Sequence, residues 1–490
     1  MWSSSGASGG KADEKTPLAA AKADAAKGAS DSSESSGVPP PGHTSLLGAV
    51  CVLATFSTTS SNVLYPRTYG TLGLVSGPLL MLVVQALMCF LAVLTVRIAT
   101  KLGCRTFGEL GGALAGPFGA RLLSGVQQLN NALFMPVALV LCADSLRDFV
   151  IAVMRCTSTE EDGPLDVGTC AWWACNINSL WVVSLLAWPV LLLARDLGEL
   201  QWNAMLSVLL IVVQTGAIIS NAAEAMPFGN SSYVVRSARN FGSVSDWQTV
   251  VASLGSFLYS FCPLFIAVEL AASMRDPSKI SLAIVLSWLF NVTIYLVTGL
   301  VVVDEWGAGL PSPVTDALSG TPALIASAIL FYCTFLDFAI VGAVLNRELQ
   351  ALWMPRFDRK CSLLNLPTWA LLTLPSLIFA LGLSILTPKL DTLNGFLNSL
   401  CIPLTMLIGV PAMLLWLYAR RDALRAPAAA LDPAASMQVS ALDLVRGWEW
   451  TLVAGVVLGV GLMLAVFTET VYSIVFLTDY GGRFFCDVVA

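Results

Sequence analysis

Long apolar runs separated by short polar stretches make up most of this chain. A helix needs about 20 consecutive apolar residues to cross about 30 Å of hydrocarbon. The 490-residue sequence contains eleven runs of this kind. They are centred near Ala54, Gln85, Phe134, Leu185, Val212, Tyr259, Tyr295, Phe331, Leu377, Met406 and Leu458. The pattern predicts an all-α membrane protein with eleven transmembrane helices.

Two of these runs are interrupted in their middles. The first begins at Leu46 and passes into six hydroxyl and amide residues, 57–62. The second begins at Trp247, becomes less apolar at Ser256 and meets Pro263. An unwound helix persists in hydrocarbon only where it is buried in protein or lines a cavity. Paired interruptions are typical of the substrate site of a secondary transporter, so the pattern favours a solute carrier.

The composition agrees with a membrane location. Hydrophobic residues make up 56% of the chain and charged residues 12%, whereas a soluble domain carries about 25% charged residues. The formal net charge of -6 is spread over loops and one tail rather than over a single face, so it does not indicate a nucleic-acid partner. The lipid bilayer is the partner that this composition predicts, and the oligomeric state stays open.

Residues 1–44 differ from the rest of the chain. They are rich in Ser, Ala, Gly, Lys and acids, and they include three consecutive prolines at 39–41. Such a composition buries too little apolar surface to offset the entropy of ordering, so we expect a disordered tail. The tail has no apolar core of the length that a signal peptide requires.

Lysine and arginine positions predict the orientation, because basic loops stay on the cytoplasmic side. Clusters such as Arg356, Arg359 and Lys360 occur in alternate loops, which places the N-terminal tail in the cytosol. The divisions we expect are a disordered cytoplasmic tail at 1–44, a ten-helix transporter core at 45–420, a cytoplasmic loop at 421–447, and the eleventh helix with a short outside tail at 448–490.

The apolar runs lack the residues expected of an enzyme or a metal site. His43, the only histidine, lies at the end of the tail, and the 12 cysteines follow no metal-ligand spacing. We therefore expect no catalytic activity, no metal and no cofactor other than a coupling ion, H+ or Na+. Cys156, Cys170 and Cys175 share a predicted outside loop, where an oxidising compartment permits a disulfide. The sequence leaves both the pairing and free thiols open.

Acidic residues inside a membrane are costly and usually mark ion or proton pathways. Asp337 lies deepest, in the eighth run, and Glu269 lies in the inner half of the sixth. We expect Asp337 to carry a coupling proton; the alternative is a structural carboxylate bonded to a Ser or Asn of a neighbouring helix. We expect Glu269 at the cytoplasmic gate, paired with Arg275 or Arg347. Sodium coupling is the other option, with Thr58 and hydroxyls of the eighth run as ligands.

Four motifs occur in the order and register of one known family. They are the stretch 62–70 (NVLYPRTYG) with Gly77-Pro78, the stretch 106–111 (TFGELG), Ala143-Asp144-Ser145-Leu146, and Glu269-Leu270 followed by 274–277 (MRDP). From residue 46 to residue 306 the chain therefore resembles the amino acid/auxin permease family, part of the amino acid/polyamine/organocation superfamily. Beyond residue 306 the resemblance rests on the number of apolar runs.

The resemblance implies an inverted repeat of five plus five helices, with discontinuous helices 1 and 6 and an appended eleventh helix. In that fold the half-helix ends bind a zwitterionic amino acid. The residues that would bind it here are Thr58, Thr59, Ser60, Ser61, Asn62, Ser256, Phe257, Tyr259 and Ser260. For the hydroxyls of the first interrupted run, the alternative is that small polar residues only pack helices together.

The family resemblance also implies the activity. A proton-coupled symporter of neutral amino acids, working by alternating access, is our leading hypothesis. Phe257 and Tyr259 favour a mid-sized apolar side chain, and a bulky aromatic substrate stays open. A sodium-coupled symporter and a non-transporting amino acid sensor on the same scaffold stay open. The family occupies the plasma membrane and vacuolar or lysosomal membranes. This chain has Thr59-Ser60-Ser61 and Cys262-Pro263 where the family motif has glycines and Gly-His, so the resemblance does not identify the substrate.

Overall fold

The computed structural model describes the chain from residue 43 to residue 472 with gaps. The described ranges are 43–154, 172–173, 175–194, 200–224, 247–261, 264–307, 310–311, 313–354, 366–386, 400–421, 438–439 and 442–472. The expected tail up to residue 42, most of the loop at 421–447 and the expected outside tail after residue 472 lie outside the described residues. Within the described ranges every element is a helix, apart from one isolated bridge between Thr44 and Met274.

The helices follow the apolar runs. In chain order they are α2 (Leu46–Leu72), α3 (Ser76–Lys101), α4 (Phe107–Val153), α6 (Asn176–Leu193), α7 (Gln201–Glu224), α9 (Trp247–Tyr259), α10 (Leu264–Ser273), η1 (Pro277–Lys279), α11 (Ile280–Trp306), η2 (Val314–Ala317), α12 (Gly320–Trp353), α13 (Leu366–Leu386), η5 (Pro403–Gly409), α15 (Val410–Ala419) and α18 (Glu449–Tyr472). The centre of each of the eleven runs lies inside one of these helices. The all-α prediction is thus confirmed for the described residues.

Six of the described helices are long and apolar enough to cross a membrane by themselves. They are α3, α7, α11, α12, α13 and α18. The two parts of α2 add a seventh span when they are counted together. The remaining crossings would use α4, α6, the pair α9 and α10, and η5 with α15, so the number eleven stays a prediction.

α2 differs from the sequence prediction at its polar run. The sequence predicts an unwound stretch there, but the helix continues and bends by 48° between Thr59 and Ser61. Thr58 and Thr59 donate their hydroxyl hydrogens to the carbonyl oxygens of Ala54 and Thr55, at 2.7 and 2.9 Å. Hydroxyls that bond back to the preceding turn bend helices without breaking them. The polar run therefore produces a bend rather than a gap.

The second interrupted run does separate into two helices. α9 ends at Tyr259, and the N–H of Ser260 closes it by donating to the carbonyl oxygen of Ser256 at 3.1 Å. α10 begins at Leu264, and residues 262–263 between the two helices lie outside the described residues. Residue 263 is a proline, which has no N–H for the helix ladder and accounts for the interruption that the sequence predicts.

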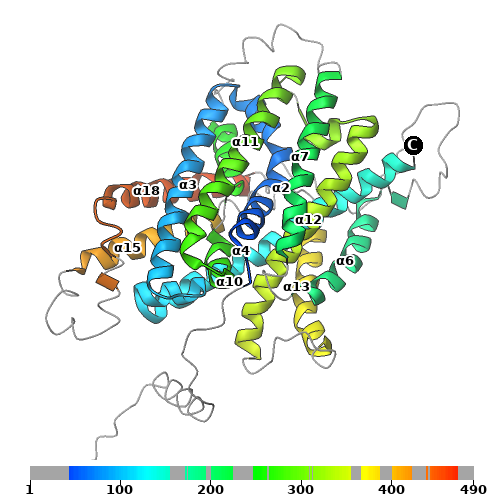
Figure 1. Ribbon diagram of the computed structural model, residues 1–490. Helices are drawn as coiled ribbons and strands as arrows, with labels where there is room; N and C mark the ends of the chain where they lie inside the picture. Colours follow the sequence, from blue (N-terminus) through cyan, green and yellow to red (C-terminus); the bar gives the residue numbers. More distant parts are fainter. Residues whose placement is uncertain are drawn as a thin grey trace, which may run out of the picture. The chain divides into compact units, whose positions relative to one another are not determined.

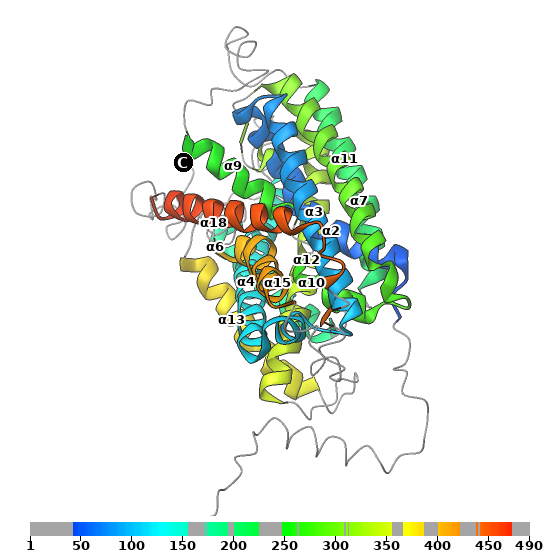
Figure 2. The ribbon, with the colours of Figure 1, turned by 90° about the vertical axis from the view of Figure 1, so that its left-hand side faces the viewer.

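Helices far apart in the sequence lie side by side. α4 packs along α12, α11 packs along α2, and α7 contacts both α2 and α12. Figure 1 shows α3, α11, α7 and α12 as neighbouring, steeply inclined ribbons. In Figure 2, α18 crosses the direction of α3 at a steep angle. Because α2 contacts α7, α9, α11 and α12, its bend lies in the interior of this group.

The eleventh helix, α18, packs closely against the tenth predicted segment. A Cβ atom on Gly459 would lie 2.6 Å from the Cβ atom of Leu407 and 2.9 Å from Ile408, so this approach requires a glycine. Leu407 and Ile408 belong to η5, which has π-helical hydrogen bonding. A π-turn widens a helix locally and is frequent near functional places.

Candidate functional site

Tyr295 of α11 joins the two interrupted segments at one point. Its hydroxyl oxygen lies 2.5 Å from the carbonyl oxygen of Ser57 in α2 and 3.0 Å from that of Ser260 after α9. Carbonyl groups at a helix end lack intrahelical donors. The Tyr295 hydroxyl therefore satisfies an acceptor at the end of α9, and the bend of α2 and the end of α9 meet at this side chain.

A hydrogen-bonded aromatic cluster adjoins this point. Gln85 of α3 donates from Nε2 to the hydroxyl oxygens of Tyr65, at 2.7 Å, and of Ser260, at 2.8 Å, and these two hydroxyls bond each other. The Tyr65 ring stacks on the Tyr295 ring with centroids 4.2 Å apart, and the Phe257 ring lies 5.5 Å from Tyr65. We call Tyr65, Phe257 and Tyr295 the outer aromatic layer, because Tyr65 follows the bend toward the predicted outer end of α2.

A second group of rings lies before the bend. The ring of Phe134 in α4 lies 5.3 Å from that of Phe56 in α2 and 5.9 Å from that of Tyr259 in α9. We call Phe56, Phe134 and Tyr259 the inner aromatic layer, since Phe56 precedes the bend on the predicted cytoplasmic half of α2. All six rings of the two layers are buried, so the bend is enclosed from both directions.

The polar run of α2 divides between two helix interfaces. The Thr58 hydroxyl hydrogen is shared between the Ala54 carbonyl oxygen and Oδ1 of Asn291 on α11, whereas Asn62 donates from Nδ2 to the hydroxyl oxygen of Thr215 on α7 at 3.2 Å. Consecutive helix residues point in different directions because one turn takes about 3.6 residues. The residues predicted to bind the ligand therefore do not all face one pocket. Thr58 contacts α11 rather than the hydroxyls of the eighth segment that the sodium alternative invokes.

Ser61 and Asn62 retain bonding capacity at the bend. The hydroxyl of Ser61 and Oδ1 of Asn62 are buried and have no hydrogen-bond partner among the described residues. A buried polar atom of this kind is unfavourable until a ligand or water bonds it. Of the other residues predicted to bind the ligand, Ser256 is half-buried, and the side chain of Ser60 lies outside the described part of the chain.

Asp337 of α12 is buried, with 1% of the residue exposed. Its hydrogen-bonding partner is the hydroxyl of Thr59. Thr59 already donates its only hydroxyl hydrogen to the carbonyl oxygen of Thr55, at 2.9 Å. The Thr59 hydroxyl thus lies between the Thr55 carbonyl oxygen and the Asp337 carboxyl group, which connects Asp337 to the bend of α2.

Glu269 of α10 has different partners from those predicted. The sequence predicts an ion pair with Arg275 or Arg347, but Oε1 of Glu269 accepts from the Phe107 backbone N–H at 3.2 Å and from Gln127 Nε2 at 2.9 Å. Phe107 is the first residue of α4, so its N–H is one of the free donors at a helix N-terminus, where the dipole favours negative charge. The N-terminus of α4 therefore provides the favourable interaction with Glu269 that the sequence assigns to Arg275 or Arg347.

A backbone clasp joins the start of α2 to the end of α10. The N–H of Thr44 donates to the carbonyl oxygen of Ser273 at 3.1 Å, and the N–H of Arg275 donates to the carbonyl oxygen of Thr44 at 3.0 Å. The hydroxyls of Thr44 and Ser273 lie 3.2 Å apart and also bond. The two interrupted segments are thus tied together at the predicted cytoplasmic end, where a carrier would have to part them.

Thr44→Pro should loosen this clasp. Proline lacks the N–H that bonds Ser273, and losing one such bond costs about 1 kcal/mol, or about fivefold in the opening equilibrium. We expect amide hydrogen exchange in residues 45–50 and 270–275 to become about fivefold faster. Thr44→Ala, which keeps the N–H, is the matched control; equal exchange rates in the two variants would show that the clasp does not hold this end closed.

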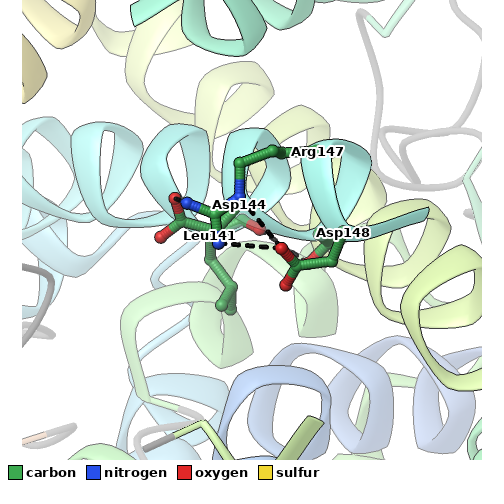
Figure 3. Close-up of polar contacts among 5 residues, drawn as sticks. Leu141, Asp144, Arg147 and Asp148 are labelled. Atoms are coloured by element: carbon green, nitrogen blue, oxygen red, sulfur yellow. Dashed lines mark hydrogen bonds and ion pairs between the residues drawn. The ribbon is translucent and has the colours of Figure 1, made fainter. Parts of the chain in front are cut away.

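A charged cluster occupies the opposite end of the bundle. Figure 3 shows Arg147 with Asp144 and Asp148 at the end of α4. Nε and Nη2 of Arg147 donate to Oδ1 of Asp148 at 2.9 and 2.8 Å, and Nη1 lies 4.0 Å from Oδ1 of Asp144. Asp316 of η2 lies near this cluster. Asp316 is exposed as a residue, but partial loss of solvent at its carboxyl group and the nearby Asp148 carboxylate raise the pKa of Asp316 to about 6, against the pull of Arg147.

Asp316→Asn should stabilise the protein at neutral pH. The folded-state pKa of Asp316 lies above its ordinary 3.8, so the folded protein binds this proton more tightly, and its contribution to stability falls as pH rises from about 4 to about 6. The ionised side chain is therefore unfavourable at pH 7.5, and the Asn variant should have the higher Tm there. Thermal unfolding should show the difference shrinking toward pH 4.5; a difference that is the same at both pH values would refute the assignment.

Cys175, directly before α6, is disulfide-bonded. Cys156 and Cys170, the other two cysteines of the predicted outside loop, lie outside the described residues. The bond agrees with an oxidising compartment on this side of the membrane.

Four side chains of the site are not among the residues that the sequence predicts to bind the ligand: Tyr65, Gln85, Asn291 and Tyr295. Each carries a polar group inside an apolar run, and such groups usually face the interior of a helix bundle. Asn291 and Tyr295 are four residues apart and so share one face of α11. Their spacing and the isolated amide of Gln85 were signals that the sequence contained.

Comparison with known proteins agrees with the motifs. The chain matches the family model described as transmembrane amino acid transporter protein over residues 43–432. Comparison with curated proteins gives no match. Among solved structures the chain is similar to MhsT in its complex with L-phenylalanine, with a TM-score of 0.57 and 15% identity, covering 88% of this chain and 100% of that one. This likeness shows the fold alone. Because the family model covers most of its length, the protein belongs to the transmembrane amino acid transporter family.

Proposed function

We propose that this protein is a secondary active transporter that carries a neutral amino acid together with a proton by alternating access. The meeting of the α2 bend and the α9 end at Tyr295 supports this proposal most directly. The end of α9 presents carbonyl groups outside its helix ladder that an ammonium can bond, and the bend of α2 brings polar side chains to the same point. The unpartnered oxygens of Ser61 and Asn62 at the bend add polar groups to this proposed substrate site. A similar fold in MhsT, solved with L-phenylalanine, is consistent with it.

In this proposal the five helices from α2 to α7 form the first repeat, and those from α9 to α15 form the second, inverted one. α18 is then the appended eleventh helix. The outer and inner aromatic layers serve as the two gates on either side of the seat. Because both gates are built from aromatic rings that must part around the cargo, a neutral amino acid with an apolar side chain of moderate size fits them.

Asp337 is the proposed proton carrier. Its only described hydrogen-bonding partner is Thr59, so a change in the protonation of Asp337 alters a contact at the bend of α2. An ionised carboxylate held among apolar side chains is unfavourable, which favours protonation before the site closes. In the sodium alternative, Thr58 and Asn291 would act as ligands, because they present oxygens to each other between α2 and α11.

A thermal-shift screen of the purified protein tests the proposal. The twenty common amino acids are each added at pH 5.5 and pH 7.5, with and without sodium. A ligand that binds only the folded state raises Tm in proportion to its occupancy. We expect neutral apolar amino acids to raise Tm more strongly at the lower pH, without a need for sodium. A sodium requirement would support the alternative ion, and no shift with any amino acid would reject the proposed substrate class.

A further inference from the structure

The part of α4 that precedes the inner aromatic layer carries an unusual set of buried amides. Gln127, Asn130 and Asn131 are 1%, 1% and 0% exposed. Among the described residues, both amide atoms of Gln128, both of Asn131 and Oδ1 of Asn130 are buried without a hydrogen-bond partner. Unpartnered amides are costly inside a protein and more so inside a membrane. Helix packing alone does not account for four amide side chains within the five residues 127–131.

The amides face the interrupted sixth segment. Residues 127, 131 and 134 are spaced by four and three, so they lie on one face of α4. At one end of this face Gln127 donates to Glu269 of α10, at 2.9 Å, and at the other end Phe134 contacts Tyr259 of α9. Asn131 lies between these two contacts. It is therefore placed beside the interval between α9 and α10, on the predicted cytoplasmic side of the inner aromatic layer.

Glu269 completes the group. Its Oε1 is bonded, but its Oε2 is buried without a partner among the described residues. Glu348 of α12 lies near enough to add a second negative charge to this region. The opposite face of α4 differs sharply, because Leu122 and Leu129 are 40% and 42% exposed and suit contact with lipid. In this part of α4 the amide side chains therefore lie on the face toward α9 and α10.

We propose that Asn130, Asn131 and Glu269 form a second, transient binding subsite for the zwitterionic amino acid, between the central site and the predicted cytoplasmic surface. The inference rests on the proposed amino acid cargo. Nδ2 of Asn131 is a donor for the carboxylate, and the free oxygens of Asn130, Asn131 and Glu269 are acceptors for the ammonium. This complement matches both charged groups of an α-amino acid.

The subsite explains why unpartnered amides are kept on this face. When the inner aromatic layer parts, the cargo leaves the seat at the α2 bend and has to cross a region of low dielectric. Polar groups that replace its lost hydrogen bonds lower the barrier to release. While the inner aromatic layer is closed, Oδ1 of Asn130 and both amide atoms of Asn131 have no described hydrogen-bond partner. This destabilises the closed conformation and favours opening.

Asn131→Leu separates this role from a structural one, since leucine is similar in size and cannot form hydrogen bonds. We expect amino acid affinity at the central site to stay within twofold of wild type, Tm to stay equal or rise, and the rate of labelled exchange across liposomes to fall at least tenfold. Asn131→Ser, which keeps a polar group, should restore part of the rate. Leu129→Ala, on the lipid-facing side of the same helix, is the control and should exchange at the wild-type rate.

The second measurement is the accessibility of position 131 to a thiol reagent, and it does not depend on whether the leucine variant folds. Asn131→Cys should react with a charged, membrane-impermeant thiol reagent supplied from the cytoplasmic side, and saturating amino acid should slow this reaction at least threefold. Leu129→Cys should stay unreactive.

The outcomes distinguish the inference from the proposed function. If wild type exchanges amino acids while Asn131→Leu does so at the same rate, or while Asn131→Cys does not react, the subsite is refuted and the transporter stands. If Asn131→Leu lowers Tm, affinity and exchange together, the residue is structural and the subsite is again refuted. If wild type itself neither binds nor exchanges amino acids, the proposed function fails first.

Discussion

Asp337→Asn is expected to abolish the stimulation of uptake by acid while amino acid binding persists. Asparagine has nearly the same shape as the protonated acid, and its amide can still bond the Thr59 hydroxyl. It cannot release a proton, so the cycle loses its coupling. Uptake driven by a pH gradient should fall to the level seen without a gradient, whereas binding affinity should stay within about threefold, a change of less than about 1 kcal/mol.

The control for this variant is Asp316→Asn. It removes a carboxylate near the charged cluster at the C-terminal end of α4, away from the bend of α2. It should keep the acid stimulation of wild type. Asp337→Glu, which can still titrate, should retain part of the response. If uptake by the Asp337→Asn protein responds to pH as wild type does, Asp337 has no part in coupling. It would then be a structural carboxylate, the alternative that the sequence allows.

Ser61→Ala is expected to weaken amino acid binding by about 10-fold to 150-fold. A hydrogen bond to a charged group contributes about 1.5 to 3 kcal/mol, and we propose that the Ser61 hydroxyl donates to the substrate carboxylate. Because this hydroxyl has no partner among the described residues, its removal should cost the folded protein nothing, and Tm without ligand should not fall. Equilibrium binding and thermal unfolding measure the two effects separately.

Ser184→Ala makes the same chemical change in α6, away from the bend. Ser184 is buried and donates to the carbonyl oxygen of Leu180 at 2.8 Å, so the variant tests whether loss of any buried hydroxyl weakens binding. We expect its affinity to equal that of wild type. Unchanged affinity in Ser61→Ala would show that the carboxylate is held elsewhere on α2.

The helices and their order could be predicted because apolar length fixes them. All eleven predicted centres lie in helices, and the interruption near Pro263 occurs where a proline removes an N–H from the ladder. The polar run of α2 misled the prediction, because its hydroxyls can bond to their own helix. Thr58 and Thr59 do so, and the helix bends instead of opening.

The partners of the site residues could not be predicted, because they depend on which helices lie side by side. Tyr295 lies 18 residues beyond Pro277, the end of the nearest motif, yet its hydroxyl contacts both α2 and the end of α9. Glu269 was expected to need a cation, but the N-terminus of α4 and the Gln127 amide fill that place. Sequence spacing gives the face of a helix on which a residue lies, and only packing gives what that face meets.

Counterflow is the most direct measurement of the central claim, that the bend of α2 and the end of α9 hold an amino acid which crosses the membrane. Purified protein is reconstituted into liposomes loaded with an unlabelled neutral amino acid, and the labelled amino acid is added outside at low concentration. The account predicts that label accumulates transiently inside above its external concentration, and that Ser61→Ala strongly reduces this accumulation. Binding of the label without any exchange would contradict transport and identify a sensor instead.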